Sequence, residues 1–319
     1  MRRILQFAAL PLSTLLLLVG CGADHSSSVL APPTANADVS MISMMKFAQD
    51  DWSLPVRLGD AVNTAFNEQG PTLSPDALSL YFCSNKPGGQ GGNDIWVSHR
   101  ASEESDWEPA VNLGPVINSQ FGDCGPNISP DGHLLFFTSA RPGIGGNDLY
   151  VSHREDPTDD LAWETPVRLG DGVNTAAFEF SPFFSQSLEA GPTNFYFERG
   201  PSNAVTHIFA AAITREGEVS GAAVEVAELN STAAEGHVTV RADGREIFFG
   251  SNRDGVNFDI YGATRRSPNE LWSTPTKIAA LNTSAFHEIH PSLSRDGRTI
   301  VFTRGIGVAN DIWMSTRAR

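Results

Sequence analysis

An all-β fold, a five-bladed β-propeller with four antiparallel strands per blade, is predicted by three features of this 319-residue sequence. A set of short β-prone segments repeats five times, the repeats are 52 to 56 residues long, and no amphipathic helix pattern separates them. The repeats occupy residues 51–319. Residues 1–20 are predicted to be a lipoprotein signal peptide and residues 21–50, rich in Ser, Ala, Pro and Met, a flexible tether.

The repeat is most visible in two polar residues that recur at fixed places. An asparagine follows an apolar residue, and an acid follows the asparagine five or six residues later. The asparagines are Asn63, Asn118, Asn174, Asn230 and Asn282, and the acids are Glu68, Asp123, Glu179, Glu235 and Glu288. Four of the five acids have a proline three residues further on, which marks the same position in each expected inner strand.

The inner strand of a blade is expected to end at a tight turn such as Ser129-Pro130-Asp131-Gly132, because Pro and Asp-Gly adopt hairpin dihedral angles. A buried second strand follows, as in Leu134 to Phe137. After a Gly-rich loop, a third strand begins at Asp148. In the third repeat, Ser181-Pro182-Phe183-Phe184 is expected to replace the Asp-Gly turn, so this blade is predicted to be degenerate.

Segments that begin at a tryptophan, such as Trp52 to Asn63, are expected to form the fourth, outer strand of each blade. The repeats begin with such a segment, and they end at a third strand, Asp311 to Ser315. The N-terminal strand is therefore predicted to complete the last blade. This closure removes two exposed sheet edges that would otherwise invite aggregation.

The N-terminus has the pattern of an export signal. Arg2 and Arg3 precede an apolar run that ends in Leu18-Val19-Gly20-Cys21, and this ending resembles the lipobox of bacterial lipoproteins. The resemblance implies that Cys21 is lipidated and anchors the protein in the bacterial cell envelope, at the periplasmic or surface face of the outer membrane. An ordinary cleaved signal peptide is the alternative. The formal net charge of −15 argues against nucleic acid as a partner, and the oligomeric state is left open.

Two repeats carry a family resemblance. SPDGHLLFFTSARPGIGGNDLYVSHR, from Ser129, and RADGREIFFGSNRDGVNFDIYGATR, from Arg241, resemble the repeat of TolB-like, WD-like β-propellers of bacterial envelopes. The resemblance covers about residues 52 to 315 and implies the fold and the compartment, whereas the repeat motif builds a blade and says little of function. The function expected is that of a non-enzymatic binding or scaffold lipoprotein that recognises an envelope protein or a glycan. An N-terminal α/β domain like that of TolB is not evident, so a role in the Tol system is not expected.

The five repeated acids are candidate ligand-binding residues at one mouth of the central channel. Five carboxylates at one level would bind a divalent cation such as Ca²⁺, or a basic peptide. In the alternative, each acid accepts backbone hydrogen bonds within its own blade. The residues concerned are Glu68, Asp123, Glu179, Glu235 and Glu288, and no other cofactor is expected.

A glycoside hydrolase acting on polysaccharide is the alternative function, because five-bladed propellers host glycosidases with carboxylates at the channel. Such catalysis needs two carboxyl groups in different environments, whereas five equivalent acids argue against it. Only Glu235, beside His237, and Glu288, flanked by His287 and His290, are locally distinctive. The spacing of these histidines matches no standard transition-metal motif, and no such site is expected.

The two cysteines of the predicted propeller lie near one another in this scheme. Cys83 ends the second strand of the first blade, and Cys124 begins the first strand of the second blade. Both are expected near the same face of adjacent blades. A disulfide and two small buried thiols are the two alternatives.

Overall fold

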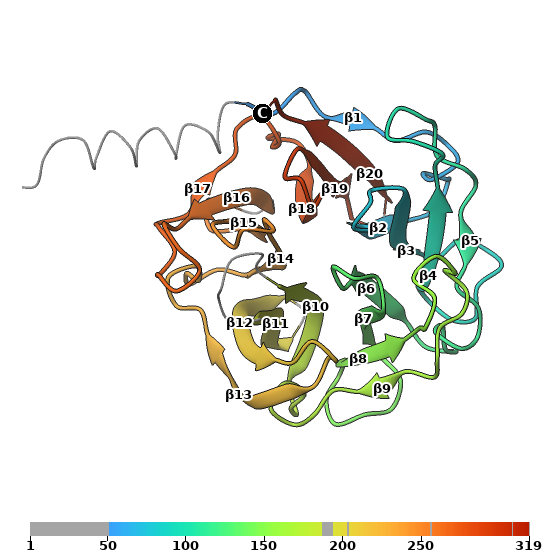
Figure 1. The fold of residues 1–319 in the computed structure, drawn as a ribbon. Helices are drawn as coiled ribbons and strands as arrows, with labels where there is room; N and C mark the ends of the chain where they lie inside the picture. The colour runs from blue at the N-terminus through green and yellow to red at the C-terminus, as the bar shows by residue number, and fades with distance from the viewer. Residues whose placement is uncertain (1–50, 187–193, 203, 256, 308, 319) are drawn as a thin grey trace, which may run out of the picture.

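The computed structural model describes residues 51–186, 194–202, 204–255, 257–307 and 309–318. The predicted signal peptide, Cys21 and the tether lie outside the described residues. Five four-stranded antiparallel sheets surround a central axis, which confirms the five-bladed propeller (Figure 1). Nowhere in the described part of the chain does a helix reach the length and apolar character that a membrane crossing requires.

The blades are numbered 1 to 5 in the order of their inner strands. Blades 1 and 2 contain β2 (Glu68–Leu73), β3 (Ser79–Ser84), β4 (Asp94–His99) and β5 (Val111–Asn112), then β6 (Asp123–Ile128), β7 (Leu134–Ser139), β8 (Asp148–His153) and β9 (Val167–Arg168). Blades 3 and 4 contain β10 (Phe178–Ser185), β11 (Asn194–Ser202), β12 (Val205–Ile213) and β13 (Val219–Glu225), then β14 (Glu235–Val240), β15 (Glu246–Ser251), β16 (Asp259–Thr264) and β17 (Thr276–Lys277). Blade 5 contains β18 (His287–Leu293), β19 (Thr299–Ile306), β20 (Ala309–Thr316) and, as its outer strand, β1 (Val56–Arg57).

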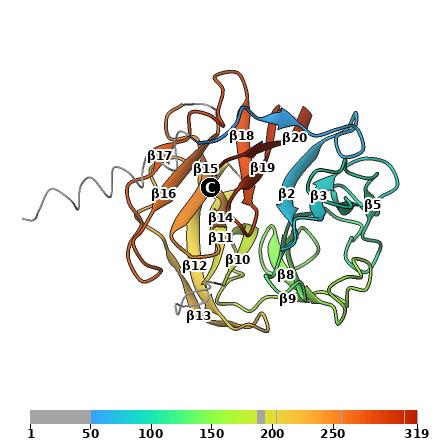
Figure 2. The ribbon, with the colours of Figure 1, turned by 45° about the horizontal axis from the view of Figure 1, so that its top comes forward.

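The two ends of the ring meet in blade 5, as the sequence predicts. Strand β1 pairs antiparallel with β20, with Val56 opposite Met314 and Arg57 opposite Trp313 (Figures 1 and 2). An isolated bridge between Trp52 and Arg317 extends this pairing. The N-terminal strand therefore closes the propeller.

Blade 3 differs from the expectation. Ser181-Pro182-Phe183-Phe184 lies inside strand β10, so the prediction that this segment replaces the turn is wrong. Its proline is equivalent to the inner-strand prolines of other blades, because it stands three residues after the buried acid Glu179. The blade is irregular in another way, since its outer strand β13 has seven residues and the other four outer strands have two.

The repeated asparagines explain why two-residue outer strands suffice. Asn118 Oδ1 accepts the Ile95 N–H at 2.8 Å, and Asn118 Nδ2 donates to the Ile95 carbonyl at 2.9 Å. The amide thus pairs with the third strand in the way that a strand residue would. Asn63, Asn174, Asn230 and Asn282 make the same pair of bonds to Ile312, Leu149, Ile208 and Ile260.

The core is built from equivalent positions of the five second strands. A phenylalanine that is fully buried stands at the same place in each blade, namely Phe82, Phe137, Phe197, Phe249 and Phe302. Apolar burial of this extent is the main force that holds such sheets face to face.

An arginine–tryptophan contact ties the end of the third strand to the turn in four blades. In blade 5 the Arg317 guanidinium lies 4.6 Å from the Trp52 ring centre, and Arg317 Nε donates to the Gly297 carbonyl at 2.6 Å. The pairs Arg100–Trp107, Arg154–Trp163 and Arg265–Trp272 are equivalent, at 4.5, 4.3 and 4.0 Å. A desolvated cation–π contact contributes up to about 2 kcal/mol.

Trp52→Ala is predicted to lower the free energy of unfolding by about 3–5 kcal/mol, because it removes a buried indole that packs edge-on against Phe248 and holds Arg317. Urea denaturation followed by fluorescence or circular dichroism measures this change. Leu54→Ala is the control, since Leu54 is 84% exposed, and it should cost less than about 0.5 kcal/mol. Equal losses in the two variants would mean that Trp52 does not secure the closure.

Candidate functional site at the mouth of the central channel

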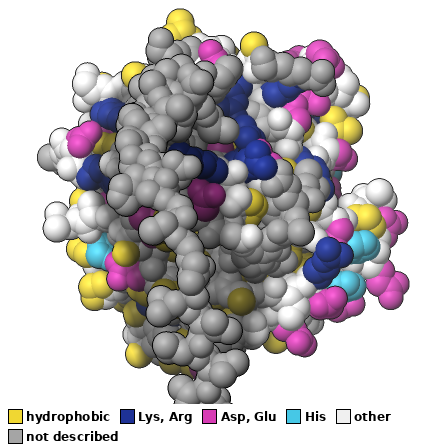
Figure 3. Space-filling view, turned by 60° about the vertical axis from the view of Figure 1, so that its left-hand side comes forward, with side chains coloured by type: hydrophobic (Ala, Val, Ile, Leu, Met, Phe, Trp, Pro, Cys, Tyr) yellow, Lys and Arg dark blue, Asp and Glu magenta, His cyan; other side chains and the backbone are white. Residues whose placement is uncertain are grey.

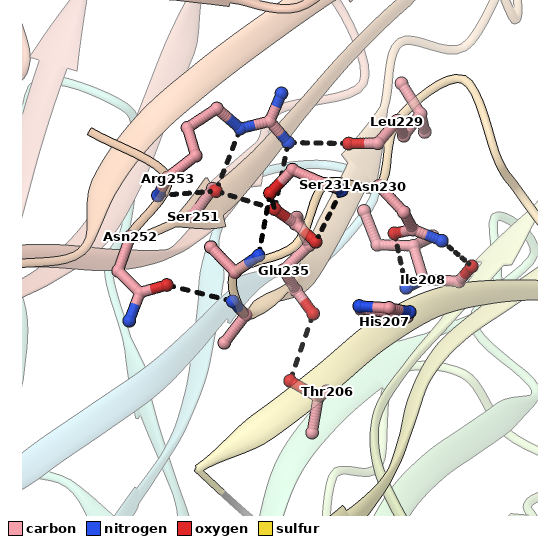
Figure 4. A network of polar contacts seen from close by, with 12 residues as sticks. Thr206, His207, Ile208, Leu229, Asn230, Ser231, Glu235, Ser251, Asn252 and Arg253 are labelled. Carbon is pink, nitrogen blue, oxygen red and sulfur yellow. Dashed lines mark hydrogen bonds and ion pairs between the residues drawn. The ribbon is translucent and has the colours of Figure 1, made fainter. Parts of the chain in front are cut away.

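The five repeated acids are wholly buried, at 0% exposure. Glu235 is typical: its carboxylate accepts the Ser231 N–H at 3.0 Å, the Ser251 hydroxyl at 3.0 Å and Arg253 at 3.2 Å (Figure 4). The loop before the inner strand, the second strand and an arginine therefore all meet at one carboxylate. This set of hydrogen bonds around the acid, called its bracket below, fixes the point where the inner strand begins.

Four of the acids pair with an arginine of their own blade. The pairs are Asp123–Arg141 at 2.9 Å, Glu179–Arg199 at 2.9 Å, Glu235–Arg253 at 3.2 Å and Glu288–Arg304 at 2.8 Å. Glu68 instead accepts bonds from Thr64 and Ser84. The geometry follows the alternative in which each acid serves its own blade. The role of these five acids as channel-mouth ligands stays a prediction.

A second ring lies two residues after the acids and faces the channel. Its members are Gly70, Gly125, Ser181, His237 and His290, and all five have left-handed backbones with φ between 48° and 62°. The register of every inner strand shifts at this place, which marks a β-bulge. Glycine adopts this conformation without strain, whereas serine and histidine do so at a cost.

Backbone strain of this kind tends to persist where the side chain has a task. The three strained residues Ser181, His237 and His290 line one cavity together. The two glycines leave space beside them, since a Cβ added to Gly125 would lie 3.4 Å from the Ser181 Cα atom. The repeated bulge thus forms the ring. The three residues other than glycine, Ser181, His237 and His290, supply its polar side chains.

Glu198, in β11, reaches this ring from the second strand of blade 3. Its Oε1 lies 3.1 Å from His237 Nδ1 and accepts the His237 backbone N–H at 3.1 Å, while its Oε2 accepts the Thr206 hydroxyl at 3.1 Å. Ser181 Oγ lies 2.5 Å from the same His237 Nδ1. A nucleophile–base relay needs the two partners on opposite ring nitrogens. Because both partners share Nδ1, these residues do not form a serine-hydrolase triad.

Burial is the main cause of the shifted pKa values of Glu198, His237 and His290. It raises the pKa of Glu198 to about 7, against the opposing hydrogen bonds from Ser181, Thr206 and His237. It lowers the pKa of His290 to about 3, and burial together with the neighbouring His290 lowers the pKa of His237. The two imidazole rings are T-shaped with centres 3.6 Å apart. Both are therefore neutral at pH 7, and Glu198 is the one group here poised to exchange a proton.

A cavity of about 430 Å³, called the mouth cavity below, opens over this group. It is lined by Gln69, Asn93, Gly122, Cys124, Gly125, Thr138, Ala140, Asn147, Phe180, Ser181, Glu198, His237 and His290. Asn93 and Asn147 end the Gly-rich loops that lead into β4 and β8. Hydroxyl and amide groups, one phenylalanine and a single carboxyl group thus face a concave space.

Sequence reasoning located part of this group. It singled out Glu235 and Glu288 as distinctive because His237 and His290 stand near them, but the two acids are buried and it is the two histidines that line the cavity. It missed Ser181 and Glu198. A signal for Glu198 exists in the repeat, because the residues at its position in blades 1, 2, 4 and 5 are small: Cys83, Thr138, Gly250 and Thr303. A lone carboxyl group among small residues marks a departure from the blade pattern.

The structure joins Cys83 and Cys124 in a disulfide beside the mouth cavity. Their Cα atoms are 5.1 Å apart, and the bond links the second strand of blade 1 to the inner strand of blade 2. Among the described residues, no group of three or more histidine, cysteine or acidic side chains is arranged to hold a metal ion.

No family model matches the chain, and no curated protein matches it. Solved structures do. An endo-arabinase from Bacteroides thetaiotaomicron VPI-5482 has a TM-score of 0.57 and 15% identity, and the match covers 82% of this chain and 97% of that one. The catalytic domain of a GH62 α-L-arabinofuranosidase from Coprinopsis cinerea has a TM-score of 0.56 and 10% identity, covering 85% and 98%. Identities this low show a shared fold alone.

TolB from Acinetobacter baumannii also matches, with a TM-score of 0.45, 14% identity and coverage of 80% of this chain and 55% of that one. The five sheets described above confirm the propeller architecture that the resemblance to TolB-like propellers implies, and the family itself stays a prediction. A similarity of this size carries no argument about family.

Glu198→Gln is predicted to change how stability depends on pH. The folded protein keeps the Glu198 proton up to about pH 7, whereas the unfolded chain releases it near the usual pKa of 4.5. Between these values the folded state holds more protons, so raising the pH lowers the free energy of unfolding. From about pH 5 to about pH 7.5 the wild type should lose on the order of 2 kcal/mol relative to Glu198→Gln.

Urea titrations of both proteins across this pH range measure the difference. His237 and His290 contribute a slope of the opposite sign, because their pKa values are lowered, but this contribution is common to both proteins and largely cancels. A difference that stays constant with pH would contradict the raised pKa of Glu198.

Proposed function

We propose that this protein is a glycan-binding β-propeller whose mouth cavity holds a short segment of polysaccharide. The observation that carries the proposal is the lining of that cavity, which combines neutral hydrogen-bonding groups and an aromatic ring around a single carboxyl group. Ligand sites are concave and hold a few placed polar groups on a partly apolar wall. A volume of about 430 Å³ falls within the range of small-ligand sites.

The polar part of the lining suits sugar hydroxyl groups. Gln69, Asn93 and Asn147 each carry a carbonyl acceptor and an NH₂ donor, so each amide can pair with a hydroxyl that donates and accepts. The four acid–arginine pairs next to the ring neutralise one another. A neutral polyhydroxylated ligand therefore fits better than the basic peptide or cation considered from the sequence.

The apolar part of the lining is Phe180, which stacks on Phe178 with ring centres 6.0 Å apart. An aromatic face at the wall of a cavity packs against the apolar face of a sugar ring. Propellers of similar shape have been solved with sugars bound: a GH62 hydrolase in complex with xylotriose and PaAbf62A from Podospora anserina with cellotriose. They support a glycan as the ligand class.

Hydrolysis of the glycan is the second candidate function, and one observation favours it. Glu198 has a pKa near 7, which suits a general acid. Both retaining and inverting glycosidases pair such an acid with a second carboxylate. The repeated acids are buried in their brackets, so Glu198 has no such partner in the mouth cavity as described. We therefore place binding before hydrolysis.

We also propose that the protein is located in the bacterial envelope. A lipid on Cys21 would hold the propeller in the bacterial envelope, probing envelope or environmental glycans from the outer membrane, and an envelope protein is the alternative partner. Nucleic acid is not proposed as a partner, because the net charge is −15.

Phe180→Ala is predicted to weaken glycan binding about tenfold, because the sugar ring loses an aromatic contact of about 1.4 kcal/mol. The full chain is titrated with arabino-, xylo- and cello-oligosaccharides in a calorimeter. Phe286→Ala is the matched control, since Phe286 is 38% exposed and lies outside the lining of the cavity. Wild-type protein that binds none of these sugars, or equal effects of both substitutions, would contradict the proposal.

The same samples distinguish binding from hydrolysis. Reducing ends are measured after prolonged incubation with each sugar that binds. We expect binding without release of sugar by the wild type. Release that disappears in Glu198→Gln would instead establish the second candidate function, with Glu198 as its acid.

Cys21→Ala is predicted to release the protein from the membrane fraction, because it removes the site of lipidation. Fractionation of cells and immunoblotting of the membrane pellet measure the change. Ser26→Ala, a few residues along the tether, is the control and should leave the protein in the pellet. A Cys21→Ala protein that stays in the pellet would contradict lipid anchoring at this residue.

A further inference from the structure

The mouth cavity extends to one side of the channel axis, over blade 2. Blades 4 and 5 each contribute a single lining residue, the bulge histidines His237 and His290. Blade 2 contributes more of the lining than any other blade: Gly122, Cys124, Gly125, Thr138, Ala140 and Asn147. The cavity therefore reaches from the axis to the end of blade 2 at which β6 begins.

Two residues form what is called the tip of a blade below. They are the residue before the buried acid and the residue after the partner of that acid in the second strand. In blade 2 both are small, Gly122 and Ala140. In every other blade at least one of the two is Asn, Phe or His: Asn67 and Asn85, Phe178 and Gly200, Ala234 and Asn252, His287 and Gly305.

The larger residues cover the tips of blades 1 and 4. In blade 4 the Asn252 Oδ1 atom accepts the Ala234 N–H at 2.9 Å (Figure 4). In blade 1 the Asn85 Oδ1 atom accepts the Asn67 N–H at 3.1 Å. The backbone of blade 2 is joined at the same place, since the Ala140 N–H donates to the Gly122 carbonyl at 2.9 Å, but alanine has no amide to lie across the tip.

Construction of the blade does not require small residues at this tip. Gly122 is not one of the glycines with a left-handed backbone, and a Cβ added to it would first meet the Asn93 backbone nitrogen, 4.0 Å away. Ala140 is exposed, and blades 1 and 4 fold with asparagine at its position. The space over blade 2 is therefore not a consequence of how the blade packs.

Two amides stand on either side of this space. The Asn93 carbonyl accepts the Asp123 N–H at 2.8 Å, and the Asn147 carbonyl accepts the Glu179 N–H at 3.1 Å. These bonds hold the Gly-rich loops of blades 1 and 2 against the inner strands of blades 2 and 3. Both asparagines line the cavity, and each side-chain amide can donate to and accept from a hydroxyl group.

The path over blade 2 is also uncharged. None of the residues that blade 2 contributes to the lining is ionised. By contrast, Figure 3, in which the blade 4 side comes forward, shows Lys, Arg, Asp and Glu side chains on the visible part of that side. Small residues between two amides thus suit a chain of neutral, hydroxylated units.

We propose that a glycan chain held in the mouth cavity leaves it over the tip of blade 2, and that Gly122 and Ala140 are the residues that keep this path open. The inference rests on the proposed glycan-binding function and narrows its ligand class. The preferred ligand is an extended neutral polysaccharide, because a disaccharide would fill the cavity without reaching the tip.

Ala140→Asn tests the path, because it introduces the residue that blades 1 and 4 carry. Its amide can accept the Gly122 N–H and cover the tip. The full chain is titrated in a calorimeter with the disaccharide and the hexasaccharide of the arabino, xylo and cello series. We expect the wild type to bind a hexasaccharide at least about tenfold more tightly than its disaccharide, as when one or two hydrogen bonds are added. Ala140→Asn should lose this advantage and keep its affinity for the disaccharide within about twofold.

Two further variants are controls. Asn85→Ala makes the reverse exchange in blade 1, outside the lining, and should leave both affinities within about twofold of the wild type. Ala140→Gly keeps the tip open and should bind both lengths as the wild type does. Retained binding of the disaccharide by Ala140→Asn verifies that this variant is folded and that its cavity is intact.

The outcomes separate this inference from the function on which it rests. Equal affinity of the wild type for the two lengths, an unchanged advantage of the hexasaccharide in Ala140→Asn, or equal weakening of both lengths by this variant would overturn the path over blade 2 while glycan binding stands. A wild type that binds neither length would contradict the proposed function, and the inference would fail with it.

Discussion

A buried carboxylate in every blade fixes the start of the inner strand, and the organisation of the channel depends on it. In blade 5 the Glu288 carboxylate accepts the Thr283 N–H at 3.1 Å and Arg304 Nε at 2.8 Å. Removing one partner of a buried pair leaves an uncompensated charge, so such brackets are strongly constrained. Because the acids are engaged within their own blades, the polar groups that line the mouth cavity come from other residues.

Those residues stand at the bulge two positions further on. Blades 1 and 2 use Gly70 and Gly125 there, where a left-handed backbone needs no side chain, and the other blades accept strain to place Ser181, His237 and His290. Residues that repeat in every blade thus stabilise the blades. The residues that differ between blades at one position of the repeat line the mouth cavity.

The fold could be predicted from the sequence because its determinants are local and repeated. The spacing of Asn63 and its four equivalents sets the blade count, and the phase of the repeat sets the closure by Trp52. The site could not be predicted in the same way. Glu198 meets His237 across two blades, and no spacing in one repeat encodes that meeting. The turn expected at Ser181 is wrong for a different reason: Pro182 is a turn signal in isolation, but here it belongs to the inner strand β10.

The described lining of the mouth cavity holds one carboxyl group, that of Glu198, among neutral polar groups and an aromatic ring. Under the proposed function this cavity would hold a glycan, with Glu198 as a neutral hydrogen-bonding group below about pH 7.

The most direct measurement of the central claim is a crystal structure of the protein soaked with a mixture of short arabino-, xylo- and cello-oligosaccharides. The account predicts electron density for sugar in the mouth cavity, with a ring against Phe180 and hydroxyl groups at Glu198 and the amides of Asn93 and Asn147. Sugar bound only at another surface, or an empty mouth cavity at saturating sugar, would contradict it.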